Sequence, residues 1–352
     1  MNKRELLAEF LTKSGVDGCA FLSDVNRYWY TGFMSTAGYI FVNKNGRSIM
    51  LIDGRYFFAA KDAVKNIDEV RLLDGNLLGK IEEILKELEI TSLALSAEYT
   101  NLEQLIMFKK INGLKISDFK SGLLRQVKEE SELDSLRKAA DIAALTIEWI
   151  KTQNIVGLTE KQVATMITIH MLEMGAEKNS FEPIVASGVN GAVPHHHCSD
   201  KKIEDGDMVT TDIGCIVDGY CSDITRTFVA GDITKANPKM IEIYNVVLKA
   251  QKLGIEKSEM GLTGADIDKI VRDVIDEAGY GEYFTHSTGH GVGIEVHEFP
   301  WISKNYNGEI KDFSVFTIEP GIYVPGLGGV RIEDTICLVN NKVEVLTRKA
   351  EK

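Results

Sequence analysis

A β-hairpin signal near the middle of the chain constrains the fold more than any other local pattern. Within residues 208–228, two β-rich runs flank the turn sequence Val-Asp-Gly at 217–219. One register of this hairpin places Asp212 directly opposite Asp223. The other register places Asp212 opposite Thr225, with Asp223 as its diagonal neighbour. Side chains of a strand alternate with period two, so both registers put the two carboxylates on one face of the sheet.

This carboxylate pair has two interpretations. Two carboxylates roughly 5–8 Å apart on a sheet repel each other, and a bound cation would remove that repulsion. Alternatively, Asp212 and Asp223 are exposed charges that flank a turn. The hairpin alone does not choose between them.

The first third of the chain alternates short apolar runs with amphipathic segments, which indicates an α/β domain. The apolar stripe of residues 1–15 predicts an amphipathic N-terminal helix that ends at Gly15. The segment 76–89 has apolar residues three and four apart, so it predicts another helix. The predicted strands are 19–22, 38–42, 48–53 and 92–96. We expect this domain to occupy residues 1–125.

Residues 126–352 combine long predicted helices with a glycine-rich region of strands and turns, which predicts a second domain of two-layer α+β architecture. A long helix is expected to begin at Ser131 or a neighbour, and a second one at Thr159, where Gln162 completes a capping-box pattern. Beyond residue 180, glycines are dense and strands alternate with turns. Two further helices are predicted there, at 239–253 and 265–278.

The composition excludes several classes of function. The net charge of −12 argues against a nucleic-acid partner, because phosphate binding needs a clustered excess of lysine and arginine. No apolar run approaches the ~20 residues of a membrane span, and the N-terminus lacks the apolar core of a signal peptide. The five cysteines form no C-x-x-C pair and are expected to be buried thiols. We therefore expect a cytoplasmic protein without a membrane partner.

A second pair of acids lies in apolar surroundings near the C-terminus. Glu319 ends an apolar run, and Glu333 lies inside a strand-like segment. A buried acid must be paired, protonated or bound to metal. Arg331, two residues before Glu333, would share its strand face, so an ion pair between them is the alternative to metal binding.

Six of the seven histidines fall in two short segments, 190–200 and 284–298. His290 lies between Gly289 and Gly291, which we interpret as a place where the backbone approaches a ligand closely. Histidines such as His196 are alternatively no more than polar groups of a loop.

Four carboxylates and one or two imidazoles make an oxygen-rich set of ligands. Such a set suits two divalent ions held by bridging carboxylates, with manganese or cobalt ahead of zinc. Two ions about 3.5–4 Å apart activate a shared water and polarise a carbonyl. The residues thus predict metal-assisted hydrolysis, and they leave the substrate open.

The order and spacing of these residues, together with the YTGF…AGY…LIDGRY pattern at 30–56, resemble those of a known family. The chain resembles the Xaa-Pro aminopeptidase and prolidase branch of the pita-bread metallopeptidases, over essentially its whole length. The resemblance implies a creatinase-like N-terminal domain at 1–125 and a pita-bread catalytic domain at 126–352. It also implies peptides with proline at the second position as substrates, and a homodimer.

The resemblance further implies two divalent metal ions per subunit and a metal-bridging hydroxide as the nucleophile. Asp212 would bind one ion, His290 and Glu319 the other, and Asp223 and Glu333 would bridge the two. Glu319 would also carry a proton from the hydroxide to the proline nitrogen.

The remaining catalytic assignments also come from the resemblance. His195 matches a loop histidine near the substrate, and His297 matches a histidine that stabilises the scissile carbonyl oxygen. His286 matches a further active-site histidine, while Arg331 and Tyr323 match residues that orient ligands and substrate.

One departure from the family pattern bears on the substrate. Prolidases commonly carry an arginine four residues after the position of His297, where it holds the carboxylate of the dipeptide, and this chain has Trp301. A neutral indole cannot form a bidentate contact with a carboxylate. We therefore favour an aminopeptidase that acts on longer peptides. The alternatives are a prolidase and a non-catalytic binding protein on the same fold.

Overall fold

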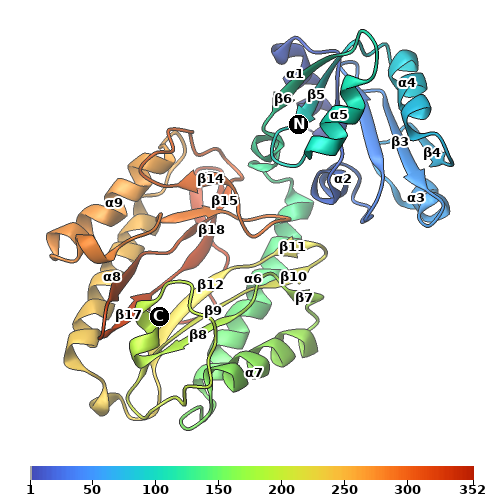
Figure 1. The fold of residues 1–352 in the computed structure, drawn as a ribbon. Helices are drawn as coiled ribbons and strands as arrows, with labels where there is room; N and C mark the ends of the chain where they lie inside the picture. The colour runs from blue at the N-terminus through green and yellow to red at the C-terminus, as the bar shows by residue number, and fades with distance from the viewer. Residues whose placement is uncertain (1) are drawn as a thin grey trace. The chain divides into compact units, whose positions relative to one another are not determined.

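The computed structural model describes residues 2–352, which form two compact units, one up to Arg125 and one from Gln126 to Lys352. Each unit has its own sheets and its own buried core (Figure 1). Within residues 2–352, no helix combines the length and the apolar content that a membrane span requires.

The N-terminal unit is built on a mixed six-stranded sheet with the order β4-β3-β2-β1-β5-β6. Strand β2 is antiparallel to both of its neighbours, and the other pairs are parallel. The strands are β1 (Gly18–Phe21), β2 (Tyr39–Asn43), β3 (Ser48–Asp53), β4 (Glu69–Leu73), β5 (Ser92–Ser96) and β6 (Lys115–Phe119). The helices are α1 (Lys3–Ser14), α2 (Asp24–Thr31), α3 (Phe57–Ala63), α4 (Leu77–Glu87), α5 (Leu102–Lys109) and the 3₁₀ helix η1 (Ser121–Arg125).

Helices bury both faces of this sheet, which explains why its central strands are apolar at consecutive positions. In β3, Ile49 and Leu51 belong to a core shared with α4 and α5. The alternate residues Met50 and Ile52 are also fully buried. The predicted strands and both predicted helices of this region are confirmed, and Gly15 ends α1 in the left-handed conformation.

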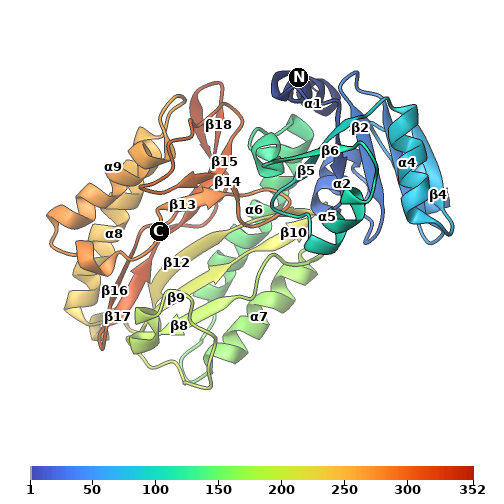
Figure 2. The same ribbon diagram turned by 45° about the horizontal axis from the view of Figure 1, so that its top comes forward.

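The second unit has two halves, each with a pair of helices packed against strands (Figure 2). Its helices are α6 (Glu130–Lys151), α7 (Glu160–Glu173), α8 (Pro238–Lys257), α9 (Gly264–Glu277), η2 (Gly188–Ala192), η3 (Ile233–Lys235) and η4 (Gly281–Tyr283). Its first strands are β7 (Lys178–Asn179), β8 (Ile184–Ser187), β9 (Met208–Ile213), β10 (Cys215–Val217), β11 (Tyr220–Cys221) and β12 (Ile224–Val229). The later strands are β13 (Gly289–Gly291), β14 (Glu298–Ile302), β15 (Val315–Ile318), β16 (Gly321–Val324), β17 (Gly328–Arg331), β18 (Asp334–Val339) and β19 (Lys342–Val345).

The apolar stripes of the helices supply the two cores of this unit. Helices α6 and α7 pack on the sheet β12-β9-β8, and α8 and α9 pack on the strands that follow residue 289. The predicted α+β architecture is therefore confirmed. The capping box of Thr159 and Gln162 is present at the start of α7. Helix α6 begins earlier than Ser131, because Glu129 occupies the N-cap and forms a box with Glu132.

The central hairpin adopts the second of the two predicted registers. Val217 pairs with Tyr220 around the turn, and Asp212 pairs with Thr225 further along. Asp218 and Gly219 have φ angles of 49° and 72°, as a two-residue hairpin turn of type I′ requires. The carboxylates of Asp212 and Asp223 are therefore diagonal neighbours.

Candidate metal centre and active site

A row of polar side chains crosses from the central hairpin to the C-terminal strands. Asp212 on β9 lies opposite Thr225 on β12, and the backbone N–H of Glu333 donates to the carbonyl oxygen of Thr225 at 3.0 Å. The hydroxyl of Thr225 donates to Oε2 of Glu333 at 2.7 Å. This contact joins the hairpin to the segment between β17 and β18, and it brings together carboxylates that lie 121 residues apart in the chain.

A second group of donors faces this row. His290 is on β13, and Glu319 directly follows β15. His290 Nε2 lies 3.4 Å from Oε1 of Glu319 and 3.6 Å from Oδ2 of Asp223. His290 Nδ1 lies 3.1 Å from the carbonyl oxygen of Gly291, which favours the tautomer with the proton on Nδ1. The Nε2 lone pair is then directed at two carboxylates.

The glycines beside His290 have a different role from the one predicted. A Cβ atom on Gly289 would lie 2.0 Å from the carbonyl oxygen of Thr317, and one on Gly291 would lie 2.2 Å from that of Phe299. The close approach is therefore to neighbouring strands of the sheet. It lets β13 hold His290 between them.

The donor set fits a divalent cation. One ligand atom from each of Asp223, His290 and Glu333 lies within 4.8 Å of the others, and all three residues are buried. Oδ1 of Asp212 and Oε1 of Glu333 are buried without a hydrogen-bond partner in the described part of the chain. Buried polar atoms are rarely left unpartnered, so these oxygens indicate sites for a cation.

The pKa values of the carboxyl groups show the same uncompensated charge. Burial, followed by the neighbouring carboxylates Glu333 and Asp212, raises the pKa of Asp223 well above its ordinary value. Burial and Glu333 raise the pKa of Glu319 in the same way. Burial and Asp212 raise the pKa of Glu333 to about 8. A bound cation would reverse these shifts, because it stabilises the ionised form of each ligand.

Arg331 pairs with a different acid from the one expected. The sequence suggested an ion pair with Glu333, whereas Nη2 of Arg331 donates to Oδ2 of Asp212 at 2.5 Å. Its link to Glu333 runs through the hydroxyl of Thr225, which accepts from Nε of Arg331 at 3.1 Å. Nη1 donates to the carbonyl oxygen of Pro194 at 3.2 Å.

Arg331 also starts a hydrogen-bonded chain through two of the predicted site residues. Its Nη1 donates to the hydroxyl oxygen of Tyr323 at 2.9 Å, and that hydroxyl lies 2.8 Å from Nε2 of His286. Burial raises the pKa of Tyr323 to about 12, and burial together with Arg331 lowers the pKa of His286 to about 4. Tyr323 is therefore protonated and His286 neutral at pH 7, so the hydroxyl can donate to the imidazole.

These groups surround a cavity of about 320 Å³. His195, His297 and Trp301 line it, and the ring of His297 lies 4.3 Å from that of His290. Burial lowers the pKa of His297. Arg331 is the only arginine or lysine among the described residues that line the cavity. All ten residues predicted for the site lie on or directly behind its walls.

Sequence reasoning missed two residues that organise this site. Thr225 appears in the hairpin register, but nothing in the sequence marks it as the link between Asp212, Arg331 and Glu333. Glu160 is an acid in the first turn of α7, where acids are common at helix starts. It contacts the loop that carries His195, and Nε2 of His196 donates to its Oε2 at 2.7 Å. His197 is largely exposed.

Comparison with known proteins assigns the two units. Residues 134–340 match the metallopeptidase family M24, and residues 3–128 match the creatinase/prolidase N-terminal domain. The Xaa-Pro dipeptidase of Pyrococcus furiosus is 37% identical, over 98% of this chain and 97% of that protein.

Two solved structures are also similar over nearly their whole length. An Xaa-Pro dipeptidase from Bacillus anthracis superposes with a TM-score of 0.94 at 36% identity, covering 99% of this chain and 98% of that one. An X-Pro aminopeptidase from Thermotoga maritima MSB8 superposes with a TM-score of 0.85 at 32% identity, covering 95% and 96%. The family resemblance of the sequence is confirmed: the chain belongs to the metallopeptidase family M24, and a creatinase/prolidase N-terminal domain precedes its catalytic domain.

Proposed function

We propose that this protein is an Xaa-Pro peptidase that uses two divalent metal ions and acts as an aminopeptidase on peptides with proline at the second position. One observation carries the proposal. Buried carboxylates with raised pKa values converge with the free nitrogen of His290 on a single cavity. Names of relatives support the substrate class, because they include Xaa-Pro dipeptidases and an X-Pro aminopeptidase.

We assign the metal ligands as the resemblance implies. Asp212 would hold one ion, His290 and Glu319 the other, and Asp223 and Glu333 both. When bound, the two ions would activate a water for attack and polarise the scissile carbonyl. The excess of oxygen over nitrogen donors favours manganese, with cobalt or zinc as alternatives.

Residues of the protein would transfer the proton that the leaving group needs. The nitrogen of a cleaved Xaa-Pro bond must gain a proton to leave as an amine. Glu319 lines the cavity beside His290, and its carboxylate would accept a proton from the attacking water and pass it to that nitrogen. His297 would contact the carbonyl oxygen and His195 the substrate, as both histidines line the cavity.

The remaining residues of the site would maintain its geometry. The chain Arg331–Tyr323–His286 holds one wall, and Arg331 orients Asp212 through an ion pair. Cleavage of an Xaa-Pro bond needs a dedicated enzyme. The nitrogen of this bond carries no hydrogen, so peptidases that recognise an extended substrate through that N–H group cannot bind it.

Trp301 favours the aminopeptidase form over the dipeptidase form. Trp301 is 36% exposed and lines the cavity, and its side chain carries no positive charge. Arg331 is already engaged by Asp212 and Tyr323. A free dipeptide carboxylate would thus lack an available arginine or lysine among the described lining residues.

A matched pair of substrates tests both levels of this proposal. The purified protein is incubated with Mn²⁺ and with Ala-Pro or Ala-Pro-Ala-Ala, and released alanine is quantified. We expect hydrolysis of both peptides to require metal, with a higher kcat/KM for the tetrapeptide. Preference for the dipeptide would make the protein a prolidase. A Trp301→Arg variant should shift the preference toward Ala-Pro.

A non-catalytic binding protein is the alternative from another class. Absence of metal-dependent hydrolysis with any Xaa-Pro peptide would favour it over the enzyme. The homodimer implied by the resemblance remains a separate proposal, which light scattering during size-exclusion chromatography would test.

A further inference from the structure

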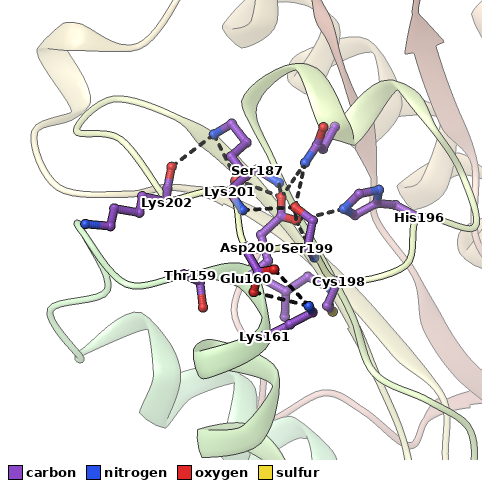
Figure 3. Close-up of polar contacts among 12 residues, drawn as sticks. Thr159, Glu160, Lys161, Ser187, His196, Cys198, Ser199, Asp200, Lys201 and Lys202 are labelled. Atoms are coloured by element: carbon purple, nitrogen blue, oxygen red, sulfur yellow. Dashed lines mark hydrogen bonds and ion pairs between the residues drawn. The ribbon is translucent and has the colours of Figure 1, made fainter.

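Glu160 is fully buried and accepts six hydrogen bonds at the start of α7. The donors to Oε1 are the backbone N–H and hydroxyl of Ser187, both at 2.8 Å, and the side-chain amide of Asn190 at 3.0 Å. The partners of Oε2 are Nε2 of His196 at 2.7 Å and the backbone N–H and hydroxyl of Ser199, at 3.0 and 2.6 Å. Figure 3 shows Ser187, His196 and Ser199 around the carboxylate of Glu160.

The two oxygens of this carboxylate hold opposite ends of one loop. Oε1 binds the segment 187–190, and Oε2 binds the segment 196–199. One side chain thereby closes the loop at its base. Lys201 reinforces the first end, because its Nζ donates to the hydroxyl of Ser187 at 3.0 Å.

His195 lies inside the closed loop. Its side chain is exposed into the cavity, so its position depends on the backbone on either side. The carbonyl oxygen of Pro194 accepts from Arg331 at 3.2 Å, and Gly191 packs so closely on Gly329 that a Cβ atom would lie 3.0 Å from the Gly329 nitrogen. The loop is thus held between Glu160 on one side and the active site on the other.

The hydrogen bonds to Glu160 favour its ionised form. Burial alone would raise its pKa, but the hydrogen bonds led by Ser199 and His196 outweigh burial and lower the pKa to about 2. A glutamine has the same shape but presents an N–H₂ group in place of one oxygen. That group would face the backbone N–H of Ser199 or Ser187, and two donors cannot satisfy each other.

We propose that Glu160 is a positioning residue, which sets the location of His195 in the active site by closing the loop 187–199. This inference rests on the proposed function, in which His195 contacts the substrate.

A double-mutant cycle tests the proposal. The variants are Glu160→Gln, His195→Asn and their combination, assayed as the manganese-loaded full chain with Ala-Pro-Ala-Ala. Lys161→Ala is the matched control, because it alters the next residue of α7 and removes only an exposed ion pair with Asp200. We expect Glu160→Gln to lower kcat/KM about tenfold with unchanged manganese content, and the double variant to be no slower than His195→Asn alone. Lys161→Ala should match the wild type.

Hydrogen exchange gives a readout that is independent of activity. The amides of residues 187–199 should exchange faster in Glu160→Gln than in Lys161→Ala, whether or not the protein cleaves peptides. The proposal would be overturned if residues 187–199 of Glu160→Gln exchanged as slowly as in the wild type. It would also be overturned if the losses of kcat/KM in Glu160→Gln and His195→Asn were additive in the double variant. An inactive wild type with faster exchange in Glu160→Gln would instead refute the proposed function alone. If Glu160→Gln does not fold, Ser199→Ala replaces it in both experiments, with the same expected and overturning results.

Discussion

Glu160 and Glu333 are both buried in the catalytic unit, yet their surroundings shift their pKa values in opposite directions. The pKa of Glu160 is lowered to about 2, while that of Glu333 is raised to about 8. Glu160 accepts six hydrogen bonds, whereas Oε1 of Glu333 has no partner in residues 2–352 and its nearest charges include other acids.

The comparison shows that donors, more than depth of burial, decide whether a buried carboxylate is a structural anchor or a prepared ligand. Six donors compensate fully for lost water around Glu160, so its carboxylate needs no further partner. The cluster around Glu333 lacks such compensation and gains it from a cation. Arg331 contacts both regions, through Pro194 and Asp212.

The largest expected effect comes from removing a ligand of the uncompensated cluster. Asp223→Ala should abolish peptide hydrolysis, a loss of several orders of magnitude, because the protein would no longer retain its metal. Elemental analysis and kcat/KM measured on the same sample check this. Retained metal with full turnover would show that Asp223 is not a ligand.

The next effect concerns Arg331, which contacts both the loop held by Glu160 and the cluster of acids around Glu333. Arg331→Lys keeps the charge but replaces a planar fork of donors by one nitrogen, which cannot reach Asp212, Tyr323, Thr225 and Pro194 together. We expect kcat/KM to fall about 10- to 100-fold with most of the metal retained. Wild-type kinetics in this variant would contradict the role given to Arg331.

A smaller effect is expected on the free energy of unfolding, which should differ between substitutions of Glu160 and of Glu333. Glu160→Gln should lower the free energy of unfolding by about 1–3 kcal/mol, because it leaves a buried donor unsatisfied. Glu333→Gln in the metal-free protein should cost less, since the raised pKa of Glu333 keeps that group largely neutral at pH 7. Urea unfolding of both variants after chelation makes the comparison, and equal losses would remove the distinction.

The last comparison is the pH dependence of stability, which has opposite signs for the two groups. Because the folded-state pKa of Glu333 is raised from 4.5 to about 8, its contribution is complete below pH 4.5 and is lost as pH rises through 8. The pKa of Glu160 is lowered from 4.5 to about 2, so its contribution is present above pH 4.5 and is lost as pH falls through 2.

Thermal unfolding of the metal-free protein checks this dependence. Between pH 5 and 8 its stability should fall with rising pH, by at most about 1.4 kcal/mol per unit for each proton. Glu333→Gln should flatten that slope, while Glu160→Gln should leave it unchanged. A slope that persists in Glu333→Gln would assign it to the neighbouring carboxyls.

Much of the fold followed from local patterns. The strand at 48–53 and the capping box of Thr159 and Gln162 appear where predicted, because each depends on residues close together in the chain. Helix α6 begins at Glu130, next to Ser131, as expected, but its N-cap is Glu129, which the sequence did not single out because glutamate is a less common N-cap than serine.

The candidate site was also partly predictable from the sequence. Residue types, their order and the family resemblance pointed to ten residues, of which nine line one cavity and the tenth, Tyr323, bonds to two of them. The partner of Arg331 was not predictable, because Glu333 lies only two residues from it in the chain while Asp212 is 119 residues away. Glu160 was missed because its role depends on a loop that begins 27 residues later.

The sequence by itself determined which chemical groups are available: four acids and a set of histidines, placed on strands and beside turns that short-range rules define. Only the tertiary structure decided what each group does. Whether a buried carboxylate becomes an anchor or a ligand depends on the donors that surround it, and those donors come from distant segments through packing. Glu160 and Glu333 are the same side chain, and their different environments give them opposite pKa shifts.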